Sequence, residues 1–260
     1  MGFDHEVLVI DNASTDDTVA RVQREFPTIT VVRNEENLGF AAGNNRGIER
    51  ARGQYLLLLN PDTVVYEGAL ARMVNYLDTH PHVAAIGPRL IEGNGRVQRS
   101  CTHYPAVSRV LFAHLTRGGY LPPGEEPSAV EAISGAALMV REDVVSTVGL
   151  LDTDFFMYGE DTEWCYRMSQ AGWEIHYLPT VTVTHLRGRS AQRVPVHTYV
   201  RRRVAKLIFL KKHGSWWQVK ILVKLFALNI VLRKWRTRDA ESAGYYEAVL
   251  AQFKREVAKL

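Results

Sequence analysis

The sequence predicts an α/β protein in which helices flank a mostly parallel sheet, followed by a helical and basic segment. Two observations support the fold class. Short apolar stretches alternate with helical patterns through the first half of the chain, and polar residues directly follow the apolar stretches, as they do where strands end at the rim of a sheet. Residues 199–238 then contain 12 Lys and Arg and no Asp or Glu, which sets this part of the chain apart.

The first predicted elements are a strand and a helix. Residues 6–10 are typical of a buried strand. Ser14, with Asp17 three residues later, predicts a helix start, because a serine cap and acidic residues in the first turn both stabilise a helix N-terminus. Pro27 ends this helix. Its apolar face comprises Val19, Val22 and Phe26.

A second strand, a helix and a third strand are expected next. Residues 29–33 predict the strand, and the polar loop of residues 34–39 leads into a helix that Gly53 stops. Residues 55–59 are an apolar run that Asn-Pro-Asp at residues 60–62 interrupts, as expected where a central strand reaches the rim of a sheet. The following helix has an inner face that comprises Leu70, Met73, Val74 and Leu77.

Beyond a strand at residues 83–87 the alternation weakens. The Gly-Asn-Gly sequence of residues 93–95 predicts a hairpin turn between short strands. Residues 102–127, rich in Pro, Gly and Arg, predict a long variable loop, and residues 130–140 predict a strand that is interrupted at Ser134-Gly135. The pattern ends with a helix and two short strands around a proline, which are predicted over residues 160–171 and 175–185.

Length and composition are those of an ordinary folded protein. The 260 residues are sufficient for a substantial core, and 46% hydrophobic with 23% charged residues exclude a disordered chain and a multispan membrane protein. Cys101 and Cys165 form no CxxC-type metal pair, so a reducing compartment is expected. The first residues lack the basic flank and apolar stretch of a signal peptide, which predicts a cytoplasmic protein.

The charge distribution predicts an anionic partner for residues 199–238. The rest of the chain contains 20 Lys and Arg and 28 Asp and Glu, so it is acidic overall. Within residues 199–238, basic residues alternate with tryptophans and aliphatic residues, as in helices that lie in the headgroup layer of a membrane. Its longest uncharged run, residues 225–232, is far shorter than the ~20 residues of a membrane span. The alternative is helices packed on the α/β domain with their cations in water; no nucleic-acid module accompanies the charge, so nucleic acid is not expected.

Two carboxylates are expected at one rim of the sheet. Asp11 and Asp62 each follow a strand, and open α/β sheets bind ligands beyond the carboxyl ends of their strands. Such a pair could bind a nucleotide base and a divalent cation that bridges diphosphate oxygens. The alternative is that Asp11 is a turn or cap residue and that residues 60–62 are only a tight turn.

Four motifs occur in order along the chain. They are VIDNASTD (residues 9–16), NEENLGFAAGNN (34–45), LLLNPD (57–62) and FFMYGED (155–161) with WCYR (164–167). The first three resemble the donor half of the family 2 glycosyltransferases, and the fourth resembles the acceptor half. The similarity is greatest to the rhamnosyltransferase-like branch. It covers residues 6–188 and leaves the C-terminal segment out.

The resemblance implies a GT-A fold, which is a Rossmann-like, mostly parallel sheet flanked by helices. It implies an inverting, metal-dependent hexosyltransferase that uses Mg²⁺ or Mn²⁺. Such an enzyme moves a sugar, for example rhamnose, from a nucleotide diphosphate to an acceptor hydroxyl. The implied process is cell-surface polysaccharide or glycolipid synthesis. The implied partners are a nucleotide-sugar donor and a saccharide or lipid-linked acceptor, which would bring the protein to the cytoplasmic face of a membrane. The predicted domains are a glycosyltransferase domain over residues 1–198, with donor and acceptor halves over about 1–100 and 101–198, and a helical basic extension over residues 199–260.

The family's motifs also imply roles for residues of the donor half. Asp11 is implied to contact the base, and Asp62 is implied to hold the metal ion. Asn60 replaces the first acid of the usual Asp-x-Asp triplet, so metal binding rests more heavily on Asp62, with help from His185. The residues implied to bind the donor are Asp11, Asn12, Asn37, Gly39, Asn45 and Asn60.

Glu160-Asp161 is similar to the family's acidic pair near the acceptor, whose second acid is usually the base. Inversion requires a base on the sugar face opposite the leaving diphosphate, which makes Asp161 the candidate. Neighbouring acids and partial burial are expected to raise its pKa from ~3.9. The alternative is that Glu160, Asp161 and Glu163 form a solvated helix start favoured by the helix dipole.

His185 follows a strand at the place where the family has a histidine that contacts the metal or the diphosphate. A lone histidine at a strand end is more often structural, and the resemblance favours the functional interpretation. Arg187 and Arg189 follow it and are expected either to neutralise phosphate charge or to face water.

One feature departs from the family pattern. Family members normally begin with another strand, which ends in a Pro-x-Tyr-Asn-like motif, and this chain begins at what should be the second strand. Because that first strand is internal in the expected sheet order, a neighbouring strand is predicted to expose its backbone groups. The alternative function is therefore a non-catalytic, nucleotide-sugar-binding remnant of the family.

Overall fold

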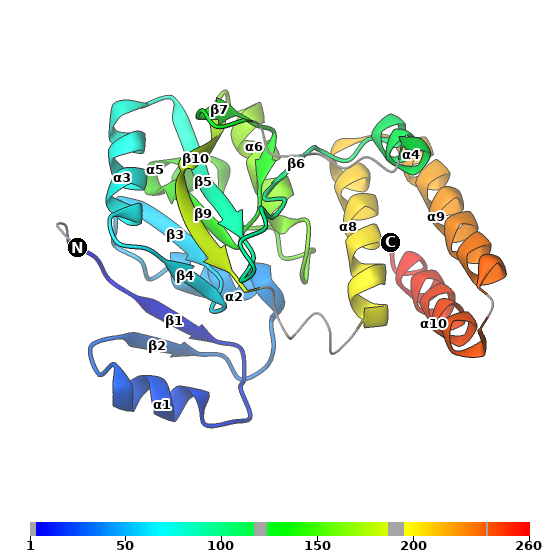
Figure 1. Ribbon diagram of the computed structural model, residues 1–260, viewed down its shortest axis with the longest axis horizontal. Helices are drawn as coiled ribbons and strands as arrows, with labels where there is room; N and C mark the ends of the chain where they lie inside the picture. The colour runs from blue at the N-terminus through cyan, green and yellow to red at the C-terminus, as the bar shows by residue number, and fades with distance from the viewer. Residues whose placement is uncertain (1–3, 117–123, 187–194, 238) are drawn as a thin grey trace. The chain divides into compact units, whose positions relative to one another are not determined.

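The computed structural model describes residues 4–116, 124–186, 195–237 and 239–260. The chain divides into two compact units, one comprising Met1–Tyr104 and Tyr120–Arg187 and the other comprising Pro105–Gly119 and Gly188–Leu260. The first unit contains the strands with the helices that cover them, and the described part of the second unit is helical (Figure 1).

The first unit begins with β1 (Leu8–Asp11), α1 (Thr18–Glu25) and β2 (Thr30–Arg33), and the two strands pair in parallel. The predicted helix start at Ser14 is wrong. The Ser14 amide instead donates to Asp11 Oδ1 over 3.2 Å, so these residues form a turn and the helix begins four residues later. No residue of α1 is buried and Phe26 is 54% exposed, so the apolar face of this helix stays outside the core.

The main sheet has six strands. The path runs β3 (Tyr55–Leu59), β9 (Ala137–Arg141), β5 (Val83–Ile91), β10 (Glu174–His185) and β4 (Thr63–Val65), and β7 (Ser128–Ala129) also pairs with β10. Strands β5 and β10 are parallel, whereas the other pairs in this sheet are antiparallel. The pairing is therefore mixed, because β9 and β4 enter the sheet without the helical crossover that a parallel neighbour requires.

The sheet is interrupted where the sequence predicts exposed backbone. Among the described residues, β1 pairs only with β2, and β3 pairs only with β9. Helix α2 (Gly39–Ile48) contacts both parts, since Gly47 lies against Ile10 of β1 while Ala41 is fully buried in the core of the main sheet. The predicted end of this helix at Gly53 is too late, because the amides of Arg50 and Ala51 fold back onto the Gly47 carbonyl.

Alternate residues of the strands pack into two cores on opposite faces of the main sheet. On one face α3 (Ala69–Thr79) buries Met73 and Leu77 against Met139 of β9, as its inner face predicts. On the other face α5 (Glu142–Val148) and α6 (Glu160–Gln170) pack against Leu138 and Val140, and Trp164 and Cys165 of α6 are fully buried (Figure 1). The three layers leave the ends of the strands free to carry polar residues.

The region between residues 90 and 140 contains one confirmed turn and one error. The turn at residues 93–95 closes as predicted, because the Gly95 amide donates to Glu92 O and the Glu92 amide donates to Arg96 O. The predicted loop over residues 102–127 is wrong in part, since α4 (Val107–Thr116) is a helix that buries Val110; residues 117–123 lie outside the described residues. The predicted break at Ser134-Gly135 separates β8 (Ala132–Ile133), which pairs with β6 (Cys101–Thr102), from β9.

The two strands predicted around Pro179 are one strand, β10. Its pairing with β5 shifts register between Leu178 and Thr182, so the proline interrupts the ladder without ending the strand. This irregularity lets β10 run on to His185 at the rim of the sheet.

The second unit contains α8 (Pro195–His213), α9 (Trp216–Arg236) and α10 (Ala240–Val257), which confirms the predicted helical character. Leu207 of α8 and Val249 of α10 are fully buried, and Phe226 of α9 packs edge-on against Phe253. Over the parts of the chain that the structure describes, no helix combines the length and the hydropathy needed to cross a membrane.

Candidate active site

Asp62 and His185 meet at the rim of the main sheet. Asp62 lies in the turn after β3, and His185 is the last residue of β10 and pairs with Thr63 of β4. His185 Nε2 lies 3.1 Å from Asp62 Oδ1, and the Leu186 amide donates to the Asp62 carbonyl over 2.9 Å. The antiparallel pairing of β4 with β10 therefore brings together the two predicted metal ligands.

Gln98 orients the imidazole of His185. Its Oε1 lies 3.0 Å from His185 Nδ1, and because a carbonyl oxygen only accepts, Nδ1–H donates to it and Nε2 is the ring nitrogen that faces Asp62 and is available to a cation. Asn60 Nδ2 lies 3.4 Å from the same Nε2. One carboxylate oxygen and one imidazole nitrogen with a supporting partner would suit a divalent cation such as Mn²⁺. The sequence carries no signal for Gln98, which lies where the strand and helix pattern is weak.

The acidic pair begins α6, after a backbone that turns sharply. Tyr158 has φ 75° and Gly159 has φ 95°, a left-handed region that a tyrosine occupies only at a cost. The only other non-glycine residue with positive φ in the described part of the chain is Ala13, in the first motif. Both outliers therefore lie beside predicted site residues.

Asp161 is held by three donors. The Gly135 amide donates to Asp161 Oδ2 over 2.9 Å, and the Thr162 amide and hydroxyl donate to Oδ1 over 2.6 and 3.2 Å. Gly135 lies in the break between β8 and β9, so this irregularity in the strand supplies the contact. Sequence reasoning located the break and did not assign it a role in the site.

Burial controls the electrostatics of the pair. Glu160 is 4% exposed, which excludes a solvated helix start. Burial, and secondarily the Asp161 charge, raises the pKa of Glu160 to about 8, and burial also raises the pKa of Asp161 against the opposing effect of its donors. Glu160 Oε2 is buried with no hydrogen-bond partner in the described structure. The three donors to Asp161 therefore favour the negative charge on Asp161, and a proton is better placed on Glu160.

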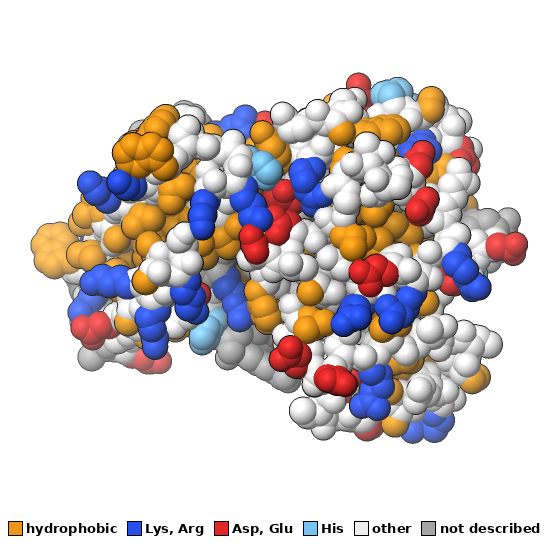
Figure 2. Space-filling view, turned by 180° about the vertical axis from the view of Figure 1, so that it is seen from behind, with side chains coloured by type: hydrophobic (Ala, Val, Ile, Leu, Met, Phe, Trp, Pro, Cys, Tyr) orange, Lys and Arg blue, Asp and Glu red, His pale blue; other side chains and the backbone are white. Residues whose placement is uncertain are grey.

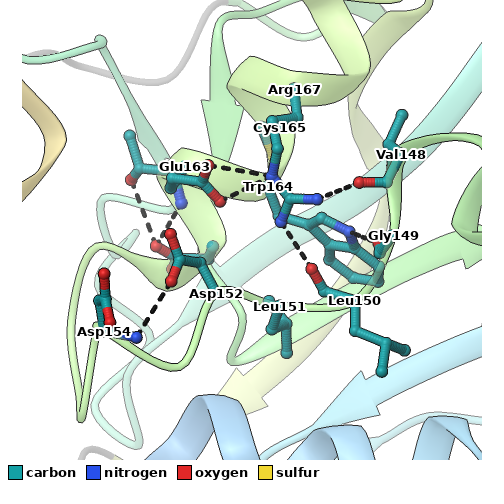
Figure 3. A network of polar contacts seen from close by, with 12 residues as sticks. Val148, Gly149, Leu150, Leu151, Asp152, Asp154, Glu163, Trp164, Cys165 and Arg167 are labelled. Carbon is teal, nitrogen blue, oxygen red and sulfur yellow. Dashed lines mark hydrogen bonds and ion pairs between the residues drawn. The ribbon is translucent and has the colours of Figure 1, made fainter. Parts of the chain in front are cut away.

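A polar network fixes the face of α6 that also carries Glu160 (Figure 3). Arg167 Nε lies 2.9 Å from both Glu163 carboxylate oxygens, and its Nη2 donates to the Leu150 carbonyl over 2.6 Å. Trp164 Nε1 donates to the Gly149 carbonyl over 2.8 Å. The segment before the fourth motif is thereby anchored to the helix that carries the acidic pair.

Asp11 presents an oxygen that the protein leaves without a hydrogen bond. The residue is 4% exposed, its Oδ1 accepts from the Ser14 amide, and its buried Oδ2 has no hydrogen-bond partner in the described structure. Arg33, which sequence reasoning did not select, has its Nε 3.9 Å from this Oδ2. A buried acceptor in this state fits a ligand N–H such as that of a nucleotide base.

The predicted donor-binding asparagines make contacts within the protein. Asn12 donates to the Gly39 carbonyl over 2.9 Å, and Asn37 Oδ1 accepts from the Gly39 amide over 3.0 Å. Asn45 uses both ends of its amide on the backbone of Leu151, at 2.8 and 3.0 Å. These side chains shape the loops of the site.

Gly39 joins the second motif to the fourth. It has φ 82°, and a Cβ there would lie 2.2 Å from the Phe156 carbonyl oxygen, so only glycine fits. The next amide, that of Phe40, donates to the same oxygen over 2.8 Å. This close approach positions the loop before α2 against the segment that leads to the acidic pair.

The turn that carries Asp62 and the acidic pair both contact one short segment. The Asn60 amide donates to the Ala136 carbonyl over 3.0 Å, and the adjoining Gly135 amide holds Asp161. No contact joins Asp11 to either pair within the described residues. The predicted phosphate contacts, Arg187 and Arg189, lie outside the residues that the structure describes.

Comparison with known proteins identifies similar sequences. The family described as "Glycosyl transferase family 2" matches residues 2–149. The N-acetylglucosaminyl-diphospho-decaprenol L-rhamnosyltransferase of Mycobacterium tuberculosis is 27% identical over 241 residues, which cover 83% of this chain and 78% of that protein. The dTDP-rhamnosyl transferase RfbF of Shigella flexneri is 24% identical over 80% of this chain and 71% of its own.

A solved structure shares the fold. The mannosyltransferase PcManGT of Pyrobaculum calidifontis, determined with GDP-Man and Mn²⁺, superposes with a TM-score of 0.53 at 19% identity, over 95% of this chain and 77% of that one. The likeness shows the fold alone and confirms the α/β, GT-A class that the sequence predicts.

Proposed function

This chain belongs to glycosyl transferase family 2, and we propose that it transfers a sugar, rhamnose first among candidates, from a nucleotide diphosphate to an acceptor hydroxyl with inversion. The observation that carries the proposal is the meeting of Asp62 with His185 beside the segment that holds Asp161. A cation-binding pair and a partly buried base close to one segment are what an in-line displacement requires.

Each residue has a role in the proposed reaction. Asp62 Oδ1 and His185 Nε2 would hold Mg²⁺ or Mn²⁺, which when bound offsets the charge of the leaving diphosphate. Asp11 accepts a hydrogen bond from the base of the nucleotide. Asp161 accepts the proton of the acceptor hydroxyl, and Glu160, whose raised pKa favours its neutral form, keeps a second negative charge out of the acidic pair.

The names of similar proteins suggest the first substrates to test. One relative is named for a dTDP-rhamnosyl donor and another for an N-acetylglucosaminyl-diphospho-decaprenol acceptor. We propose dTDP-rhamnose and a polyprenyl-diphosphate-linked sugar for this chain, which would place it in cell-surface glycan synthesis. The products of donor hydrolysis and of sugar transfer can both be measured directly.

The test of this function is transfer of labelled rhamnose from dTDP-rhamnose to the lipid-linked acceptor, with and without Mn²⁺. We expect a product that requires the metal ion, and a rate of product formation that falls by about 10² or more in the Asp161→Asn variant. UDP- and GDP-sugars serve as comparison donors. Donor binding by the purified chain with neither transfer nor hydrolysis would instead identify a non-catalytic member of the family.

The basic segment exposes aromatic side chains on α9. Trp216 is 70% exposed and Trp235 is 81% exposed, and Lys220 Nζ lies 4.2 Å from the centre of the Trp216 ring. Hydrophobic side chains gather with Lys and Arg over the C-terminal helices (Figure 2). We propose that residues 199–238, of which Arg238 lies outside the described residues, bind an anionic membrane surface.

Vesicle sedimentation tests this surface. Binding to phosphatidylglycerol vesicles should weaken as salt rises, because salt screens the attraction, and should fall about fivefold for each of Lys220 and Lys224 changed to Gln. Trp216→Ser should also weaken binding, whereas Phe26→Ser, which removes an exposed aromatic ring from the first unit, should not. Equal sedimentation with neutral and anionic vesicles would contradict the proposal.

A further inference from the structure

A second cluster of metal-ligating side chains lies at the other end of β10. His82 precedes β5, and Glu174 and His176 begin β10, so the cluster is on the order of 30 Å along the strand from His185. His176 Nε2 lies 2.7 Å from Glu174 Oε2, and His82 Nε2 lies 3.5 Å from the same oxygen. We propose that these three residues bind a divalent transition-metal ion, of which Zn²⁺ is the best fit.

The separations of the ligand atoms suit such an ion. Zn²⁺ binds imidazole nitrogen and carboxylate oxygen at about 2.0–2.2 Å in a tetrahedron, which places ligand atoms about 3.4 Å apart. The three candidate atoms lie within 4.8 Å of one another, and the two contacts with Glu174 lie on either side of the tetrahedral value. A water molecule can take the fourth position, because His82 and Glu174 are exposed.

The backbone holds two of the ligands in register. The Glu174 amide donates to the His82 carbonyl over 3.1 Å, and Glu174 pairs with Val83 at the start of the parallel β5–β10 ladder. Residues two apart on a strand present their side chains on the same side, which brings His176 next to Glu174. The cluster is therefore part of the most extensive strand pairing in the molecule.

Tyr76 supplies the supporting contact that metal-binding histidines usually have. Its hydroxyl lies 2.8 Å from His176 Nδ1, so Nδ1–H can donate to the phenol oxygen and leave the Nε2 lone pair for the ion. His80 stacks on the Tyr76 ring with centroids 4.0 Å apart, which holds the ring in place. His176 itself is largely buried, with a side chain 11% exposed. This support distinguishes the cluster from a chance group of surface histidines.

A bound ion would join the end of α3 to the starts of β5 and β10. It would stabilise the folded state by binding there and not to the unfolded chain, and it would stand apart from the proposed catalytic pair at the opposite rim. Metal binding at this cluster does not depend on the proposed glycosyl transfer.

Zn²⁺ titration calorimetry on tag-free protein tests the site, in an Asp62→Ala background that removes a ligand of the catalytic pair. We expect one Zn²⁺ per chain and a rise in the midpoint of thermal unfolding. His82→Ala, His176→Ala and Glu174→Gln should each weaken binding by at least about tenfold, and Tyr76→Phe, which retains every ligand, by about tenfold. His197→Ala, an exposed histidine of α8, is the matched control and should bind as its parent does.

Two results would overturn the proposal. One is Zn²⁺ binding that is absent from the Asp62→Ala background, and the other is equal affinity in the ligand variants and the His197→Ala control. Glu174→Gln preserves the size and a hydrogen bond of the side chain, so it remains informative if a histidine variant fails to fold. Co²⁺ absorption offers a second readout, because visible bands of a tetrahedral site should vanish in the same variants.

Discussion

Asp161→Asn is expected to lower turnover by about 10² or more while donor affinity stays nearly unchanged. The acceptor hydroxyl is a weak nucleophile, so a carboxylate must take its proton as the bond to the sugar forms. Asparagine has the same size but cannot accept that proton, and its amide group would face the Gly135 or Thr162 donors that hold the native carboxylate. Steady-state transfer kinetics and donor calorimetry measure the two quantities.

Glu160→Gln is the matched control within the pair, and it should cost less turnover than Asp161→Asn. It should also change the pH profile. Activity requires ionised Asp161 and is lost as pH falls through the pKa of that group, where Glu160 is already protonated, so Glu160→Gln should leave the acid limb in place. An inflection near pH 8, where Glu160 of the parent loses its proton, should be absent from the variant. A large loss in Glu160→Gln with near-parental turnover in Asp161→Asn would reverse the assignment, and full activity in both would place the base elsewhere.

Asp62→Ala is expected to abolish the Mn²⁺-dependent part of donor binding and to leave the fold intact. The substitution removes the carboxylate that lies against His185, and the remaining imidazole cannot hold the cation on a diphosphate by itself. The contact of the Asp62 carbonyl with the Leu186 amide uses backbone atoms only, so the rim of the sheet should persist. Calorimetry with and without Mn²⁺ measures the effect, and circular dichroism checks the fold.

Two further variants provide comparisons for the effect of Asp62→Ala on donor binding. Gln98→Ala should weaken Mn²⁺-dependent binding by about 10- to 100-fold, the usual effect of losing the partner that orients a ligand. Asp143→Ala removes an exposed acid at the start of α5 and should leave donor binding unchanged. If Asp62→Ala keeps its Mn²⁺-dependent affinity, Asp62 does not belong to the metal site.

The sequence alone was sufficient to predict a residue's structural role wherever that role depends on its near neighbours in the chain. The apolar run of β3 and the Asn-Pro-Asp after it placed Asp62 at a rim, and the helical spacing of Met73 and Leu77 identified the buried face of α3. Local patterns misplaced the start of α1, because a competing hydrogen bond from Ser14 to Asp11 does not appear in helix propensity. They also missed α4, whose helix precedes a stretch rich in proline and glycine.

The sequence by itself determined the family, the fold class and the residue types of the site. Only the tertiary structure decided which of them touch. Gln98 meets His185 across 87 residues, and Asn45 meets Leu151 across 106. It also showed Glu160 to be buried and Asp161 to be partly buried, which alters their pKa values and hence their chemistry. Such contacts and burial depend on how distant segments pack, whereas helix and strand patterns depend on residues a few positions apart, and only the latter can be inferred from a single sequence.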